Sequence, residues 1–419
     1  MIINRTLNNG IRVVMESLPF VQSVSVGIWV RAGSVDELPV YSGISHLIEH
    51  MLFKGTKSRS AKKIAEDVDR IGGHMNAFTG KEATCYYIKT LEKNVDKACD
   101  ILIDMFMNSV FDPDELKKEK DVIFEEIKMI EDNPEDLAGD LLLEMVFRGT
   151  ALEQSIIGTR ESLEGIARDS IIDFLSQKYT TDNIVISVAG SFDADHICEL
   201  FNESFLAAQS GKSRTPGHKA QYEPSYQVRV KDVEQSHICM GVKGIAQEDP
   251  LYFPMALLNN IIGGSMSSRL FQNIREQKGL AYSVYSSSNS YVTDGIYSIY
   301  AGVSHTKIEA AIDAIAEEMK LVKTSGIGSE ELSIAKEQLK SSYVFSQENV
   351  NNRMYANGKN TLLLSRVLTA QEIIERIDQV EEEAMLRATD LIADIGRYSA
   401  VLVSSKDYDI CSKIVGLAV

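Results

Sequence analysis

The chain has 419 residues, more than the roughly 250 to 300 at which a single hydrophobic core stops growing, so we expect at least two domains. Apolar residues make up 44% and charged residues 25%, which is typical of soluble globular proteins and excludes the disordered, collagen-like and coiled-coil classes. The net charge of -17 excludes nucleic acid as an expected partner and would attract basic peptides instead.

The sequence also carries information about compartment. No apolar run approaches the ~18 residues needed to span a bilayer, and the first residues lack the apolar core of a signal peptide. Five widely spaced cysteines without a C-x-x-C pair indicate free thiols in a reducing compartment. We therefore expect a cytoplasmic protein with no membrane contact.

The first half alternates strand and helix patterns. Strands are expected at residues 10–16 and 22–31, where β-branched residues partly alternate with polar ones. Asp112 and Pro113 suit the start of a long helix. In chain order, the remaining predictions are helices near 42–54 and 60–71, strands at 74–79 and 84–90, helices at 94–109, 112–132, 134–147 and 168–179, a strand at 183–190 and a helix at 193–206.

The second half repeats this order after a break in periodicity. Glycines and prolines mark residues 211–224 as a linker between a first domain, 1–210, and a second domain, 225–419. An offset of about 210 residues superimposes the two halves. The elements expected there are strands at 226–232 and 235–244, helices at 251–262 and 266–277, strands at 281–291 and 295–303, and helices from 307. We expect an α+β fold of two homologous repeats, each a mainly antiparallel sheet packed with helices.

One short motif predicts a metal site. His46 and His50 lie about 40° apart on one face of the helix expected at 42–54, with Glu49 beside them. Two imidazoles one turn apart suit Zn²⁺, and the carboxylate can take a proton from a water that the metal activates. This H-x-x-E-H order is the inverzincin motif. The alternative is a solvated polar face, but the apolar residues around the motif indicate a mostly buried helix, where His and Glu need partners.

A catalytic zinc also needs a third protein ligand. The helix expected at 112–132 is the best source, because Glu119 and Glu126 are seven residues apart and share a face near the apolar side. Glu125 points about 100° away from that face. Helical spacing favours Glu126 but leaves Glu125 open, and an ordinary acidic solvated face is the alternative to both.

Together these residues resemble the pitrilysin/insulysin family of zinc peptidases, and especially proteins similar to the mitochondrial processing peptidase β subunit. The resemblance covers nearly the whole chain. It rests on the stretches GISHLIEHMLFKGT at 43–56, GGHMNAFT at 72–79, VIFEEI at 122–127, MSSRLF at 266–271 and GLAY at 279–282.

The resemblance assigns roles that spacing leaves open. It implies that Glu126 is the third ligand and that Glu119 supports the ligands from behind. It also implies that Asn76, Ala77, Phe78 and Thr79 form an edge strand that pairs with extended substrate, although these residues alone suit an ordinary interior strand. Arg275 and Tyr282 would contact the substrate carbonyl, whereas without the resemblance they are an exposed cation and a strand aromatic.

The expected function is that of a zinc metalloendopeptidase. His46, His50 and Glu126 would hold one Zn²⁺ per chain, because the second repeat has Pro254, Leu257 and Leu258 where the motif would fall. Glu49 would act as the general base. The resemblance implies a dimeric chamber that admits short or unstructured peptides, including basic, presequence-like ones. A homodimer is favoured over a heterodimer, and the competing function is that of a catalytically silent binding or assembly subunit.

Overall fold

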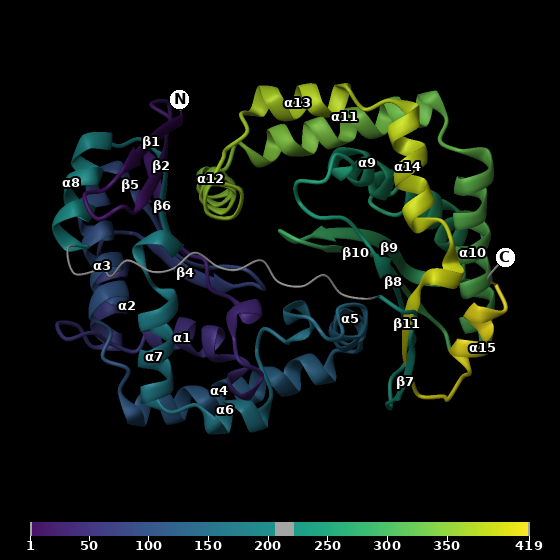
Figure 1. Ribbon diagram of the computed structural model, residues 1–419, viewed down its shortest axis with the longest axis horizontal. Coiled ribbons are helices and arrows are strands. Elements are labelled where there is room, and N and C mark those ends of the chain that lie inside the picture. Colours follow the sequence, from purple (N-terminus) through teal and green to yellow (C-terminus); the bar gives the residue numbers. More distant parts are fainter. Residues whose placement is uncertain (1, 206–221, 418–419) are drawn as a thin grey trace. The chain divides into compact units, whose positions relative to one another are not determined.

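The computed structural model describes residues 2–205 and 222–417 (Figure 1). They form two compact units, each built around one sheet. Unit 1 consists of the described residues within Met1–Ile127, Gln154–Thr215 and Phe345–Val367, and unit 2 of those within Lys128–Glu153, Pro216–Val344 and Leu368–Val419. Within the described ranges, no helix is both long and apolar enough to cross a membrane.

The sheet of unit 1 has six strands in the order β1-β2-β6-β3-β5-β4. β2 and β6 run parallel, and the other neighbouring pairs are antiparallel. β4 is therefore an edge strand. The bounds are β1 Ile2–Thr6, β2 Arg12–Ser17, β3 Ser23–Val30, β4 His74–Thr79, β5 Thr84–Leu91 and β6 Ile184–Gly190.

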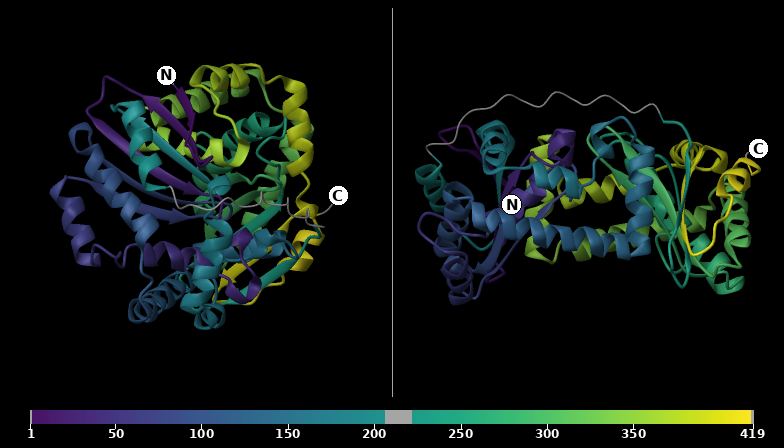
Figure 2. Two further views of the ribbon diagram at one scale, coloured as in Figure 1. Left: turned by 60° about the vertical axis from the view of Figure 1, so that its left-hand side comes forward. Right: turned by 90° about the horizontal axis from the view of Figure 1, so that it is seen from below.

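The two faces of this sheet are buried in different ways. Val26 and Ile28 of β3 lie in a core with apolar residues of α1 (Ile44–Leu52), α3 (Val95–Asn108) and α8 (Ala194–Ser204). Trp29 alternates with them and faces α12 (Val350–Leu364), where a Cβ at Gly358 would lie 2.2 Å from the indole nitrogen. Figures 1 and 2 show α3 and α8 on one face and α12 on the other. Both faces are thus covered.

The sheet of unit 2 has five strands in the order β7-β11-β8-β10-β9. One face packs against α9 (Tyr252–Ile262), α10 (Ile308–Ser325) and α14 (Glu382–Ile392). α5 (Pro134–Val146) covers the other face over β8 and β11 (Figure 1). The strand bounds are β7 Tyr226–Val230, β8 Ser236–Lys243, β9 Ala281–Ser290, β10 Gly295–Val303 and β11 Ser399–Ser404.

The strand orders confirm the expected fold of two α+β repeats. Without β1, the order β2-β6-β3-β5-β4 in unit 1 corresponds strand by strand to β7-β11-β8-β10-β9 in unit 2, including one parallel pair in each. Apart from short 3-10 helices, the other helices of the described residues are α2 Ala61–Arg70, α4 Pro113–Asp132, α6 Arg160–Gly165, α7 Arg168–Lys178, a π-helix at Phe271–Gln277, α11 Ser329–Ser346, α13 Ala370–Asp378 and α15 Ile410–Val415.

The two units are not simple halves of the chain. The boundaries 1–210 and 225–419 remain a prediction about the sequence repeats. In the structure, the segment with α5 packs in unit 2 and the segment with α12 packs in unit 1. Each sheet has a second apolar or small-residue face that must be covered, and the helix that covers it comes from the other repeat. Most of the expected linker, 211–224, lies outside the described residues.

Most expected elements have a counterpart whose bounds differ by only a few residues. The helix expected at 266–277 begins at Arg269, and its larger part, Phe271–Gln277, is a π-helix and not an α-helix. β1 and the C-terminal strand β11 were not among the expected elements.

Candidate metal centre

α1 presents three polar side chains from an otherwise buried helix. Leu47, Ile48 and Met51 are almost fully buried in the core of unit 1. At the start of the helix, the carboxylate of Glu37 accepts hydrogen bonds from the backbone N–H groups of Gly43 and Ser45 at 2.7 and 2.8 Å. These bonds satisfy two of the free donors at the helix N-terminus. The apolar face and this cap together fix the direction in which the polar face points.

The structure brings His46, His50 and Glu126 together. One ligand atom from each lies within 4.8 Å of the others. The Nε2 atoms of His46 and His50 lie 3.8 and 3.7 Å from the same oxygen, Oε2 of Glu126. Glu126 comes from α4, and its neighbour Glu125 is exposed. Of the two carboxylates that spacing left open, Glu126 is the one near the imidazoles.

The donor chemistry of this set fits zinc. Two imidazole nitrogens and one carboxylate oxygen match the ligands of catalytic zinc sites, which leave a fourth position open. Burial and the neighbouring His50 lower the pKa of His46 to about 4, so that its imidazole is neutral at neutral pH, as metal binding requires. Nδ1 of His46 is buried and has no hydrogen-bond partner in the described part of the chain.

Glu119 supports His50 from behind. Its Oε2 lies 3.1 Å from Nδ1 of His50, and its Oε1 lies 2.7 Å from Nζ of Lys54. Glu119 is only 4% exposed, so the ammonium group balances a buried charge. An imidazole that donates through Nδ1 keeps the Nε2 lone pair for a metal. The sequence did not predict this contact of Lys54, which lies four residues after His50 and just beyond the end of α1.

Glu49 lies on α1 between His46 and His50, but it is not one of the three clustered residues His46, His50 and Glu126. Burial raises the pKa of its carboxyl group above the usual value. Thr79 Oγ1 donates a hydrogen bond of 2.5 Å to Glu49 Oε2. Glu49 is therefore held by a residue of the expected substrate strand.

The expected substrate strand is β4, and it lies at the edge of its sheet. Asn76, Ala77, Phe78 and Thr79 pair with β5 on one side only. The ring of Phe78 packs edge-on against Trp29 and Tyr355, with centroids 5.4 and 5.6 Å away. An edge strand offers free backbone groups to an extended peptide, so its position is compatible with the expected role.

Arg275 and Tyr282 lie in unit 2, whereas His46, His50 and Glu126 lie in unit 1. Within unit 2 the two side chains are neighbours, because the Arg275 guanidinium lies 5.7 Å from the centre of the Tyr282 ring and 4.7 Å from that of Phe271. Tyr282 is 75% exposed, so its hydroxyl group is accessible to a ligand.

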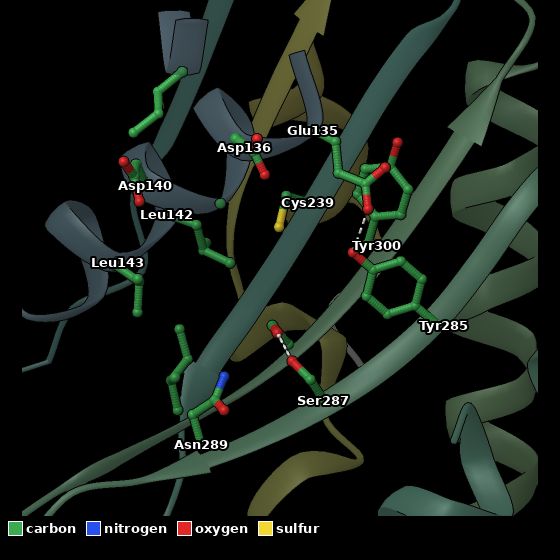
Figure 3. A pocket seen from close by; sticks show the side chains of 14 residues that line it. Glu135, Asp136, Asp140, Leu142, Leu143, Cys239, Tyr285, Ser287, Asn289 and Tyr300 are labelled. Atoms are coloured by element: carbon green, nitrogen blue, oxygen red, sulfur yellow. Dashed lines mark hydrogen bonds between the residues drawn. The ribbon is translucent and has the colours of Figure 1, made fainter. Parts of the chain in front are cut away.

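Unit 2 also contains an acidic pocket that sequence reasoning missed. Its volume is about 400 Å³, and Figure 3 shows Glu135, Asp136 and Asp140 of α5 along it. Tyr285 donates a hydrogen bond of 2.6 Å to Glu135. The N-P-E-D-x-x-x-D sequence at 133–140 puts Asp136 and Asp140 one helical turn apart, but nothing in it shows that they reach a pocket.

Comparisons with known proteins agree with this geometry. Residues 12–160 match the family model described as Insulinase (Peptidase family M16), and residues 165–339 match that described as Peptidase M16 inactive domain. A Bacillus subtilis protein described as the uncharacterized zinc protease YmxG is 44% identical over 384 residues, which are 91% of this chain and 93% of that protein. An uncharacterized zinc protease of Mycobacterium leprae is 36% identical over 383 residues, 90% of this chain and 86% of the relative.

Solved structures show the same fold at lower sequence identity. A protease from Helicobacter pylori has a TM-score of 0.89 and 22% identity, covering 96% of this chain and 99% of its own. A chain of Complex III2 from Candida albicans has a TM-score of 0.86 and 20% identity, covering 100% of both chains.

Proposed function

Because the chain belongs to the insulinase family of peptidases (Peptidase family M16), we propose that it is a zinc-dependent endopeptidase that hydrolyses peptide bonds. The observation that carries the proposal is the set of His46, His50 and Glu126, whose ligand atoms lie within 4.8 Å of one another. No second set of this kind occurs in residues 2–205 and 222–417, so we propose one zinc per chain.

Each side chain of the site has a proposed task. Zinc, when bound by His46, His50 and Glu126, supplies Lewis-acid activation of a water molecule. Glu49 accepts the proton of that water as it attacks the peptide carbonyl, and then delivers it to the leaving amine. The raised pKa of the Glu49 carboxyl suits a group that must both accept and release a proton. Glu119 holds the His50 ring through Nδ1.

We propose that substrate binds in extended form along β4. Asn76, Ala77, Phe78 and Thr79 provide a strand edge that pairs through the backbone and therefore makes little demand on substrate sequence. This mode requires a segment without structure of its own, so short or unfolded peptides are the proposed substrates. Arg275 and Tyr282 are proposed to donate hydrogen bonds to the substrate carbonyl as negative charge develops on it.

A preference for basic peptides is supported by charge. The chain carries a net charge of -17, and the carboxylates of Glu135, Asp136 and Asp140 line one pocket of unit 2. Cationic side chains, such as those of presequence-like segments, complement such a surface. We also propose that two copies of the chain form a homodimeric chamber, in which Arg275 and Tyr282 of one copy serve the zinc of the other.

The test is a fluorogenic peptide assay on the purified chain, with and without a chelator, alongside Glu49→Gln. We expect chelator-sensitive turnover that Glu49→Gln abolishes while its zinc content stays that of the wild type. Equal and negligible signals in all samples, with zinc bound, would instead indicate a catalytically silent binding or assembly subunit.

A further inference from the structure

The hydroxyl group of Thr79 occupies a position between the strand edge and the general base. Thr79 is the last residue of β4, where it pairs with Thr84 of β5. Its Oγ1 lies 2.5 Å from Oε2 of Glu49, on the helix that carries the two histidines. An ionised carboxylate can only accept hydrogen bonds, so the hydroxyl group is the donor.

The hydrogen bond from Thr79 engages only one of the two carboxylate oxygens of Glu49. In the described part of the chain, Oε2 of Glu49 has Thr79 as its partner, and Oε1 has no hydrogen-bond partner. A bond on one oxygen restricts rotation of the carboxylate, while the second oxygen stays available to accept a proton. A hydrogen bond to an ionised carboxylate is stronger than one between two neutral groups.

Thr79 is itself held by a rigid turn. The chain after it reverses through a hydrogen bond from Gly80 N–H to Ala83 O at 2.9 Å. Val35 N–H donates to Lys81 O at 3.0 Å, and a Cβ at Gly33 would lie 2.4 Å from Gly80 O. This close backbone packing fixes the end of β4, and with it the starting point of the Thr79 side chain.

We infer that Thr79 is a positioning residue, whose hydroxyl group orients the Glu49 carboxylate and thereby couples the substrate-binding edge of β4 to the general base. The inference rests on the proposed function for its catalytic consequence. The geometric part, that Thr79 sets the orientation of Glu49, stands independently of turnover. It assigns the Thr79 side chain a task beyond the backbone pairing of the strand.

The kinetic test compares Thr79→Val, which removes the hydroxyl group at nearly constant volume, with Thr79→Ser, which keeps it. Thr79→Val should lower kcat by between about tenfold and a hundredfold, because the base is no longer held in its reactive orientation. KM should change little, since the backbone edge is intact, and zinc affinity should match the wild type. Thr79→Ser should restore most of the lost kcat.

Thr90→Val is the matched control. Thr90 is buried in β5 and donates to a backbone carbonyl, Ile71 O, at 3.1 Å. The Thr90→Val substitution removes a comparable hydroxyl group that does not contact Glu49. The kcat of this variant should therefore stay close to that of the wild type. A kcat of Thr79→Val equal to that of Thr90→Val, in an enzyme that turns over, would overturn the catalytic inference.

Crystal structures of the wild type and both Thr79 variants separate this inference from the proposed function. We expect the Glu49 carboxylate to move in Thr79→Val and to keep its place in Thr79→Ser. An unmoved carboxylate in Thr79→Val would contradict the positioning role whether or not the chain is a peptidase. Absence of turnover in the wild type would refute the proposed function and leave the structural comparison to decide the role of Thr79.

Discussion

At the scale of single residues, the proposed third zinc ligand is distinguished from its neighbour by one position along α4. Glu125 and Glu126 are adjacent and chemically identical, and helical spacing alone did not separate them. In the structure, Glu126 Oε2 lies 3.7 Å from His50 Nε2, whereas Glu125 is exposed. The difference arises because neighbouring residues on a helix point about 100° apart.

This difference gives a paired prediction. Glu126→Gln should weaken zinc binding by at least the 10 to 100-fold typical of losing a residue that supports a metal ligand, because a charged donor is lost. Glu125→Gln should bind zinc as the wild type does. Competition with a chromophoric chelator measures both, and similar affinities for the two variants would argue against Glu126 as a ligand.

At the scale of elements, the N-terminus of α1 depends on a buried carboxyl group. Glu37 is 6% exposed and caps the helix through the N–H groups of Gly43 and Ser45. Burial raises the pKa of Glu37 to about 7, against the opposing effect of those hydrogen bonds. The helix that carries His46 and His50 therefore begins at a group that titrates near neutral pH.

The sign of the pH effect follows from the raised pKa. Between about pH 4.5 and 7 the folded state keeps a proton that the unfolded state has lost, so the free energy of unfolding should fall as pH rises through this window. The fall amounts to about 3 kcal/mol for the whole window. In the Glu37→Gln variant, this fall in the free energy of unfolding between about pH 4.5 and 7 should be absent.

Denaturant unfolding at pH 5, 6 and 7 tests this prediction. Fluorescence of Trp29 provides the signal, because it is the only tryptophan of the chain and lies in the same unit as Glu37. Identical pH slopes for the wild type and Glu37→Gln would show that Glu37 does not bind the proton.

α12 in unit 1 and α5 in unit 2, which each cover one face of a sheet, give another paired prediction. Ala at Gly358 of α12 would collide with the Trp29 ring, at 2.2 Å from Nε1, and should lower the stability of unit 1 by about 1 to 3 kcal/mol. Ala at Gly139 of α5 meets no atom within 4 Å, and should raise helix stability by about 0.5 to 1 kcal/mol. Urea unfolding followed by Trp29 fluorescence and circular dichroism measures both. A tolerated Gly358→Ala would contradict the close packing of α12.

The sequence predicted what depends on local spacing. The polar face with His46, Glu49 and His50 and most helices and strands follow from periodicity, and the family resemblance implied Glu126. Lys54, the Thr79 hydroxyl group and the Glu37 cap were not predicted, because each acts through a contact that only the folded chain makes. The sequence also did not predict that α5 and α12 each cover the sheet of the other repeat. Periodicity shows that a helix is amphipathic, but it does not show which sheet the helix covers.

At the scale of the whole molecule, the two repeats share a strand order but differ in chemistry. The first repeat carries the zinc motif, and the second has Pro254, Leu257 and Leu258 at the corresponding positions. The match of residues 165–339 to a model described as an inactive domain agrees with this asymmetry. The proposed work of unit 2 is to provide Arg275, Tyr282 and the acidic pocket.

The proposed homodimer can be tested by mixing two inactive variants. Glu49→Gln keeps Arg275, and Arg275→Ala keeps Glu49, so a mixed dimer that shares residues between copies contains one complete site. After unfolding and refolding of an equal mixture, we expect about a quarter of wild-type activity from random pairing of the two chains. No recovery, with dimers present by analytical ultracentrifugation, would show that Arg275 serves the zinc of its own chain.

The proposed function requires that two histidines and one glutamate hold zinc. X-ray absorption at the zinc edge of the purified protein tests this most directly, because it reports the ligand atoms themselves. We expect nitrogen and oxygen ligands at about 2.0 to 2.1 Å, with the outer-shell pattern of two imidazoles and no sulfur. A sulfur shell at about 2.3 Å, or a spectrum without imidazole, would show that His46, His50 and Glu126 do not hold the zinc.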